Sequence, residues 1–151
     1  MGKTIGIEIT GASELRAKFE RLKKELEPAV IYGVNRGLLL VESRSKNRCP
    51  VDTGHLRGSI TTSPASSKDD GTVSGLVFTP TEYAIYVECG TGVRGQSTFP
   101  YKIEKFTPQY KSGWPGQVAQ PYMIPSLLES KTEATKMVAL AVKAAIKKGK
   151  S

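Results

Sequence analysis

The residue types best suited to chemistry gather in one segment, Cys49–Ile60, which reads CPVDTGHLRGSI. It contains Asp52-Thr53-Gly54, the tripeptide of aspartic proteases, whose mechanism needs two neighbouring carboxylates that share a proton. The tripeptide occurs once, so a protease would have to be a homodimer. Those enzymes carry the tripeptide after an apolar strand, whereas Pro50 here follows a helical pattern with a polar end. A dimeric aspartic protease therefore stays open only as the weakest alternative.

A cysteine–histidine site would have to use His55, the single histidine, with Cys49 or Cys89. The same three side chains are the candidate ligands for a metal ion. They lack the paired C-x-x-C or H-x-x-x-H spacing that metal sites show. We therefore predict no metal and no cofactor, and we expect two free, structural thiols.

A glycine pattern, GTGVRG at Gly90–Gly95, matches the G-x-G-x-x-G fingerprint of dinucleotide-binding proteins. That fingerprint works where a strand turns into a helix whose N-terminus faces phosphate. Here the sequence QSTFP follows and predicts no helix, and no βαβ unit surrounds it. We therefore predict no nucleotide site.

The segment Cys49–Ile60 has a simpler structural interpretation as a joint. Pro50 would stop a helix, Asp52 would accept backbone N–H bonds from the next turn, and Gly54 would let the chain reverse. Leu56 and Ile60 would anchor the strand that leaves the joint. The predicted joint residues are Pro50, Asp52, Thr53, Gly54, Leu56 and Arg57.

Composition indicates one ordinary domain, residues 1–151, with 38% apolar residues. No run is long enough to span a membrane and no signal peptide is present, so we expect a soluble protein. A net charge of +8 makes contact with a polyanion plausible. The basic residues follow no recognition-helix or zinc-finger pattern, so a basic nucleic-acid-binding regulatory module is kept as an alternative.

Two helical patterns dominate the first third of the chain. Thr4–Thr10 alternates isoleucines with small or polar residues and predicts a strand that pairs with the main sheet. Apolar spacings of three and four predict helices from Ser13 to about Leu26 and from Pro28 to about Arg48, or one kinked rod. In the second helix Leu39 and Leu40 lie off the apolar stripe. This helix should therefore be either central in the fold or packed against another subunit, and Leu39 and Leu40 are candidate interface residues.

Short strands are predicted next. Gly58–Thr62 and Thr72–Thr79 should form an antiparallel pair joined by the polar connection PASSKDDG. Tyr83–Cys89 fits a third strand or a single helical turn. Residues 90–120 hold many glycines and prolines and predict a long interfacial loop.

A final helix should begin at Pro125, and residues 147–151 should form a basic, frayed tail. The fold class is therefore α+β. We expect a small antiparallel sheet packed with two N-terminal helices, which are alternatively one kinked helix, a C-terminal helix and a long loop excursion.

Three blocks, in order, resemble a bacteriophage family: PVDTGHLRGSI from Pro50, YAIYVECGTG from Tyr83 and QPYMIPSL from Gln120. The family is that of the head-to-tail joining proteins of long-tailed phages, also called neck, tail-completion or minor tail proteins. This sequence departs from the usual pattern at Cys89, where an aromatic residue is commoner, and at Ile124, where arginine is frequent.

The resemblance implies a structural virion protein without enzymatic activity, assembled in the bacterial host cytoplasm. It implies a homo-oligomeric ring, with six-fold or twelve-fold symmetry, that joins the tail or neck to the portal-connector complex. The implied partners are portal-connector or head-completion proteins, tail terminator or tail tube proteins, and passing DNA without sequence preference; no membrane is implied. Because aromatic residues are enriched at interface hot spots, we predict anchors at Phe99, Tyr101, Phe106, Tyr110 and Trp114.

Overall fold

The structure is a computed structural model that describes residues 12–103 and 106–149. It confirms the α+β class, with a two-stranded antiparallel sheet among helices. The predicted Thr4–Thr10 strand lies outside the described residues. In chain order the elements are α1 (Ala12–Arg48), α2 (His55–Ser59), β1 (Thr61–Ser67), β2 (Val73–Phe78), α3 (Ala84–Cys89), α4 (Gly92–Thr98) and α5 (Met123–Lys148).

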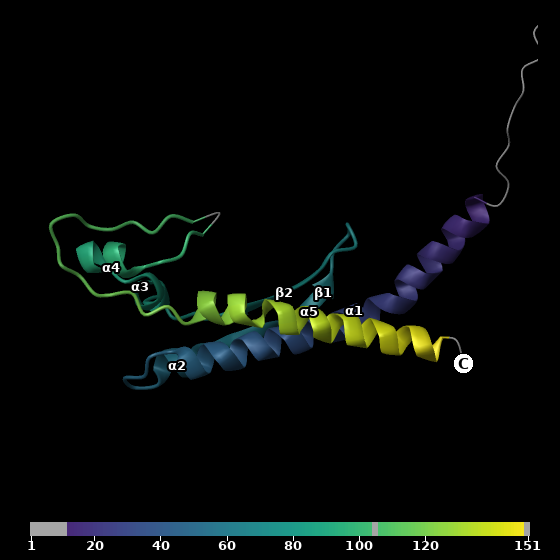
Figure 1. Cartoon of the computed structure of the whole chain (residues 1–151), viewed down its shortest axis with the longest axis horizontal. Helices are drawn as coiled ribbons and strands as arrows, with labels where there is room; N and C mark the ends of the chain where they lie inside the picture. Colours follow the sequence, from purple (N-terminus) through teal and green to yellow (C-terminus); the bar gives the residue numbers. More distant parts are fainter. Residues whose placement is uncertain (1–11, 104–105, 150–151) are drawn as a thin grey trace, which may run out of the picture.

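The first helix, α1, is a single helix of 37 residues with Pro28 inside it. Figure 1 shows that α1 changes direction between its purple N-terminal part and its blue remainder. Proline removes one backbone hydrogen bond and crowds the preceding turn, so it bends a helix without having to end it. Of the two sequence-based alternatives, the kinked rod is the correct one.

Helices α1 and α5 lie side by side along the molecule (Figure 1). Their contact is built from small residues spaced by four, which fall on one helical face. A Cβ added to Gly33 would lie 2.6 Å from the Cα of Val138, and one on Gly37 would lie 2.9 Å from the Cβ of Ala134. The two backbones therefore approach as closely as glycine allows. The series on α1 is Gly33, Gly37, Val41 and Ser45, and that on α5 is Ser126, Ser130, Ala134 and Val138.

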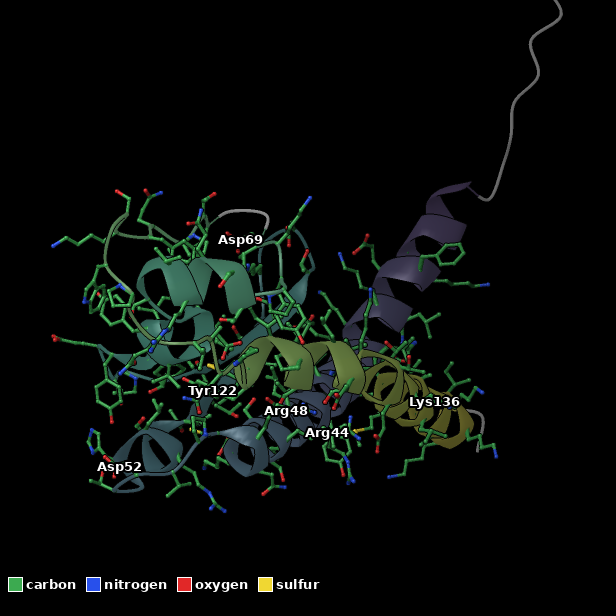
Figure 2. The ribbon with its side chains drawn as sticks, turned by 60° about the vertical axis from the view of Figure 1, so that its left-hand side comes forward. Arg44, Arg48, Asp52, Asp69, Tyr122 and Lys136 are labelled. Atoms are coloured by element: carbon green, nitrogen blue, oxygen red, sulfur yellow. The ribbon has the colours of Figure 1, made fainter. Side chains whose placement is uncertain are left out.

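Two arginines of α1 extend the same contact at its edge. Arg44 donates to the Ser130 hydroxyl at 3.0 Å and to the Glu133 carboxylate at 2.6 Å, and Arg48 pairs with Glu129 at 2.6 Å. Figure 2 shows both arginines beside α5. These pairs are partly exposed, so each contributes at most about 1 kcal/mol. They fix the register of the two helices more than they stabilise them.

The sheet corrects two predicted boundaries. β1 starts at Thr61, because the preceding residues form the short helix α2. It continues through PASS, part of the connection predicted from the sequence. The pairing runs from Thr61 opposite Phe78 to Ser67 opposite Val73, with an irregularity between Ser63 and Ser66. The second predicted strand, β2, is confirmed at Val73–Phe78.

One face of the sheet rests on α1. The Asn35 side-chain oxygen accepts the backbone N–H of Ala65 at 2.8 Å, and Glu42 accepts the hydroxyl of Thr62. A hydrogen bond from Lys46, followed by that from Thr62, lowers the pKa of the Glu42 carboxyl. Polar contacts therefore hold the sheet against one face of α1, while a neighbouring face of α1 packs against α5.

The predicted third strand at Tyr83–Cys89 is wrong: Ala84–Cys89 is the helix α3, the other sequence-based option. The long excursion also contains a helix that we did not predict, α4, formed by GVRGQST. Both are short helices whose ends are fixed by contacts with distant residues, which local propensity cannot supply. No described helix is long and apolar enough to cross a membrane.

Candidate functional site

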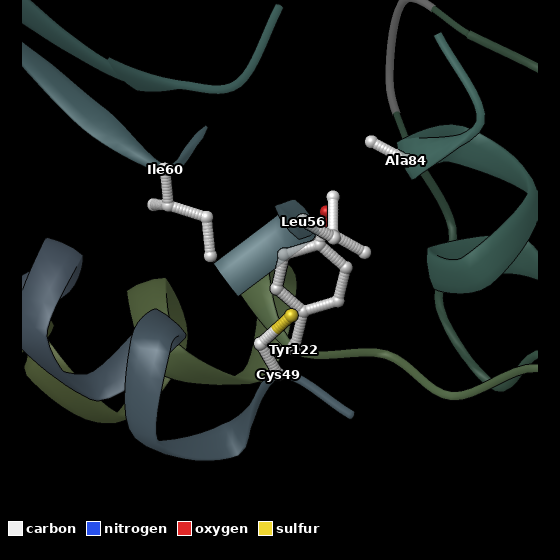
Figure 3. Close-up of a cluster of buried hydrophobic side chains, with 5 residues drawn as sticks. All are labelled: Cys49, Leu56, Ile60, Ala84 and Tyr122. Atoms are coloured by element: carbon white, nitrogen blue, oxygen red, sulfur yellow. The ribbon is translucent and has the colours of Figure 1, made fainter. Parts of the chain in front are cut away.

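The joint after α1 folds around a small apolar cluster. Cys49, Leu56, Ile60, Ala84 and Tyr122 are all buried, and they come from three parts of the chain: the joint, α3 and the start of α5. Figure 3 shows the Tyr122 ring against Leu56, with the Cys49 sulfur beside it. The predicted anchors Leu56 and Ile60 therefore do meet in the core, and they bring the joint together with the start of α5.

The turn of the joint differs from the prediction in one respect. Gly54 has a φ of 83°, which is strained for other residues, as the predicted chain reversal requires. The side chain that accepts a turn N–H is Thr53, whose hydroxyl receives the N–H of His55 at 3.4 Å. Asp52 is exposed and has no hydrogen bond to any described residue. The capping role assigned to Asp52 is wrong, and Thr53 holds the turn instead.

Past the joint, three hydroxyl groups tie α2 to the end of the sheet. The Ser59 hydroxyl lies 2.7 Å from that of Thr79 and 2.8 Å from that of Thr81, and it donates to or accepts from each. Pro50 is half-buried and Arg57 is exposed, at opposite ends of this region. Ser59 thus connects the joint to the residues that follow β2, a role that was not predicted from the sequence.

A buried carboxylate, Glu88, organises the start of α5. It is 6% exposed, and it accepts the backbone N–H groups of Tyr122 at 2.8 Å, Met123 at 3.0 Å and Ile124 at 2.9 Å. The first N–H groups of a helix have no partner within the helix, and the helix dipole favours a negative charge there. Glu88 meets both needs and so couples α3 to α5.

Sequence reasoning missed Glu88, although a signal was available. It is the only charged residue in the otherwise apolar run AIYVEC. A carboxylate is rarely buried without partners, so such a position indicates a specific acceptor role. The small residues at every fourth position of α1 and α5 were a second signal, which indicates that these two helices pack closely. It was missed because the larger apolar residues dominate the pattern.

Both cysteines are free and buried, which bears on the candidate cysteine–histidine site. Burial raises the pKa of the Cys49 thiol, and burial with the adjacent Glu88 carboxylate raises the pKa of Cys89 to about 11. A thiol becomes a nucleophile or metal ligand as the thiolate, which these surroundings disfavour. Within residues 12–103 and 106–149, no group of three or more histidine, cysteine, aspartate or glutamate side chains could hold a metal ion.

The glycines of GTGVRG serve a contact within the chain. Thr91 and Gln117 exchange two backbone hydrogen bonds, at 3.0 and 3.1 Å. A Cβ on Gly116 would lie 1.9 Å from the Thr91 carbonyl oxygen, and one on Gly92 would lie 2.4 Å from the Trp114 carbonyl oxygen. The glycines therefore let two backbone segments touch, an arrangement we call the glycine clasp (residues 90–95 with 114–117).

The clasp also occupies the end of α4 where a phosphate would have to bind. The N–H of Val93 donates to the Trp114 carbonyl and that of Arg94 to the Pro115 carbonyl, each at 3.0 Å. The donors on which a phosphate site depends are therefore used inside the protein. Although α4 is a helix where we predicted none, the conclusion against a nucleotide site gains a physical reason.

A groove of about 920 Å³ lies between the joint and the glycine clasp. The joint contributes residues 50–56, including His55, and the opposite wall carries the aromatic side chains Tyr83, Tyr86 and Trp114. Among the described residues that line it, Asp52 is the only carboxylate. An aspartic protease needs two such groups at one site, so a single chain does not supply them.

The predicted interface aromatics fall into two groups. Phe99 and Tyr101 are half-buried and pack edge to face, 5.8 Å apart, and the Tyr110 hydroxyl donates to the Cys89 carbonyl at 3.1 Å. These three cover their own part of the protein. Phe106 and Trp114, at 43% and 47% exposed, are the two whose side chains remain available to a partner.

The two leucines predicted on α1 also differ. Leu39 is 58% exposed, whereas Leu40 is half-buried. On α5 the serines Ser126 and Ser130 are fully buried, and Ile124, Met137, Val138 and Val142 are half-buried. Three large apolar side chains of α5 are nevertheless exposed by more than half: Leu127, Leu128 and Leu140.

In the described part of the chain, Glu88 and both cysteines are buried in structural contacts, and several large apolar side chains are exposed. The chain belongs to the family described as "Bacteriophage HK97-gp10, putative tail-component", whose model matches residues 13–90, just over half of the chain. The protein is thus a bacteriophage tail component. Comparisons with curated proteins and with solved structures gave no match.

Proposed function

We propose that this protein is a structural subunit of the head–tail junction, where it forms a ring that completes the tail or neck and joins it to the portal-connector complex. Family membership supports a place in the phage tail. The finer assignment to the junction rests on the resemblance of the three sequence blocks, and the ring on the surface described above.

The observation that carries self-association is the exposure of three leucines on α5, Leu127, Leu128 and Leu140. Burying serines and exposing leucines is unfavourable for a lone protein, because each buried leucine side chain contributes about 1.5–3 kcal/mol that the free subunit forgoes. An assembly that covers Leu127, Leu128 and Leu140 recovers this energy. A closed ring does so with one repeated contact between unlike surfaces.

In the proposed ring the further interface residues are the exposed Leu39, Phe106 and Trp114. Neighbouring proteins of the portal-connector and of the tail tube or tail terminator would contact the two rims. The exposed lysines and arginines that give the net charge of +8 would face passing DNA or acidic neighbours, without reading bases. No catalytic step belongs to this role.

The deciding experiment is deletion of the gene in a producing phage, with electron microscopy of the particles. The proposal expects filled heads and finished tails that are not joined, and rescue by the wild-type protein. A matched rescue with Leu140→Asp, which places a charge on the exposed α5 surface, should fail, whereas Lys68→Asp, in the exposed connection between β1 and β2, should restore joining. Fully joined, infectious particles from the deletion would refute the assigned role.

A further inference from the structure

The two-stranded sheet has a free edge. Within the described residues, β2 forms backbone hydrogen bonds only with β1. A sheet of two strands is marginally stable in water, and an unpaired strand edge is a ready template for another strand. The edge of β2 is therefore a place where a further strand would fit.

The two edges of this sheet are not equivalent. β1 contains Pro64, which has no N–H to offer, and the irregularity between Ser63 and Ser66. The N–H of Ala65, within that irregularity, is already bound to Asn35. Proline and bulges are the usual means by which proteins block an edge strand. β2, with the sequence VSGLVF, carries neither proline nor charge and has no such protection.

The face of β2 that points away from α1 is also uncovered. Val77 packs against the apolar cluster and Gly75 lies against Leu38, so alternation turns Leu76 and Phe78 to the other side. Their side chains are 65% and 40% exposed. A strand that is added here would gain most if it brought apolar residues to that face.

We propose that the Thr4–Thr10 segment of a second copy of this chain pairs with β2 as a third strand. Its sequence, TIGIEIT, alternates three β-branched isoleucines with small or polar residues, the pattern of a strand with one apolar face. The isoleucines would lie beside Leu76 and Phe78. The inference rests on the proposed function, because it supplies a contact that joins successive subunits of the ring.

The length of the N-terminal segment decides whether it can pair with β2 of its own chain or only with β2 of a neighbouring copy. Gly75, in the middle of β2, lies against Leu38, so the middle of β2 lies at the level of Leu38. From Ala12 to Leu38 a helix rises by about 39 Å. Residues 4–11 span at most about 28 Å when fully extended. When the chain is extended, Ile7 lies at most about 18 Å from Ala12. Because this is less than half the rise from Ala12 to Leu38, Ile7 reaches the middle of β2 only in another copy.

Cross-linking of full-length protein at high concentration tests the proposal. Copies that carry Ile7→Cys are mixed with copies that carry Leu76→Cys and oxidised; the native cysteines are buried and remain silent. The matched control replaces the second variant by Val51→Cys, since Val51 is similarly exposed, at 57%, and lies outside the proposed ring contact. We expect about tenfold more covalent dimer from the first mixture, because pairing raises the local concentration of the two thiols.

Equal yields from the two mixtures, or no dimer in the first, would overturn the inference. So would a double variant, Ile7→Cys with Leu76→Cys, that closes within one chain at every dilution. Ile7→Pro, which cannot pair as a strand, should abolish the cross-link that Leu76→Cys forms with Ile9→Cys, whereas Lys3→Pro should leave it. If rings form but the cross-link does not, the strand pairing is refuted and the proposed function is retained. If the cross-link forms but the deletion phage still joins heads to tails, the proposed function is refuted and the strand pairing is retained.

Discussion

The α1–α5 pair and the lobe formed by residues 84–121 use glycine for opposite purposes. In the helix pair, Gly33 and Gly37 make room for a neighbouring helix while keeping ordinary helical backbone. In the lobe, Gly90, Gly92 and Gly116 have positive φ and make room for another backbone. The first region is held by packing along two regular elements, the second by individual hydrogen bonds between irregular segments.

Because of this difference, the two regions should tolerate substitutions differently. A change in the helix pair acts on a long contact that can adjust by a small shift of one helix. A change in the glycine clasp meets backbone atoms that have no alternative position, since the same atoms are used in hydrogen bonds.

Gly116→Ala should disrupt the lobe and leave the helix pair formed. The new Cβ would lie 1.9 Å from the Thr91 carbonyl oxygen, at a φ of 64°. We expect a loss of about 3 kcal/mol or more for the lobe, from strain and overpacking together. Emission from Trp114, the single tryptophan, should shift to the red while the helical circular dichroism stays near the wild-type value.

The control is Gly113→Ala, at a φ of 74° but with nothing within 4 Å of the added Cβ. It isolates the cost of positive φ, about 1–2 kcal/mol. Equal losses for the two variants would show that the close approach in the clasp is unimportant.

Gly33→Ala should weaken the helix pair by about 1–3 kcal/mol, the usual cost of overpacking. The added Cβ would lie 2.6 Å from the Cα of Val138, so α5 has to move away. This loss exceeds the gain of up to about 1 kcal/mol that alanine brings to a helix. Gly58→Ala, in a helix with open space around it, is the control and should be neutral or stabilising. Thermal unfolding followed at 222 nm compares them; a stabilised Gly33→Ala would contradict the close-packed contact.

Glu88→Gln tests the link between the two regions. An amide can accept fewer of the three N–H bonds at the start of α5 and loses the charge that the helix dipole favours. We expect a loss of about 1–3 kcal/mol in the free energy of unfolding. Glu82→Gln, an exposed neighbour on the same segment, should change it little. Indistinguishable unfolding curves for the two variants would remove Glu88 from this role.

Periodicity predicted the long helical stretches and the antiparallel pair, because these depend on local patterns of apolar residues, and it left open whether α1 is one kinked helix or two. It could not predict α3 and α4, which depend on Glu88 and on the backbone of residues 114–117. The predicted interface residues also fall into two groups, those left exposed and those engaged in contacts that depend on distant residues. Trp114 is exposed as a hot spot requires, whereas Tyr110 is engaged with Cys89, a partner that spacing does not reveal.

The smallest effect is expected at the joint that lies between the two regions. Figure 2 places Asp52 at the end of the molecule away from Lys136, and its carboxylate is exposed. The sequence indicated that Asp52→Ala would cost about 0.5–2 kcal/mol as a lost cap. Since Thr53 accepts the N–H of His55, we now expect that variant to change unfolding by less than about 0.5 kcal/mol.

Thr53→Ala should instead lose about 0.5–1 kcal/mol, the value of one neutral hydrogen bond at a turn. The pair is best compared in urea, where the midpoints differ if the two residues have different roles. A larger loss for Asp52→Ala than for Thr53→Ala would restore the sequence-based assignment. Because the joint connects α1 to the wall of the groove, that result would also mean that Asp52 gains its partner only in the assembled tail.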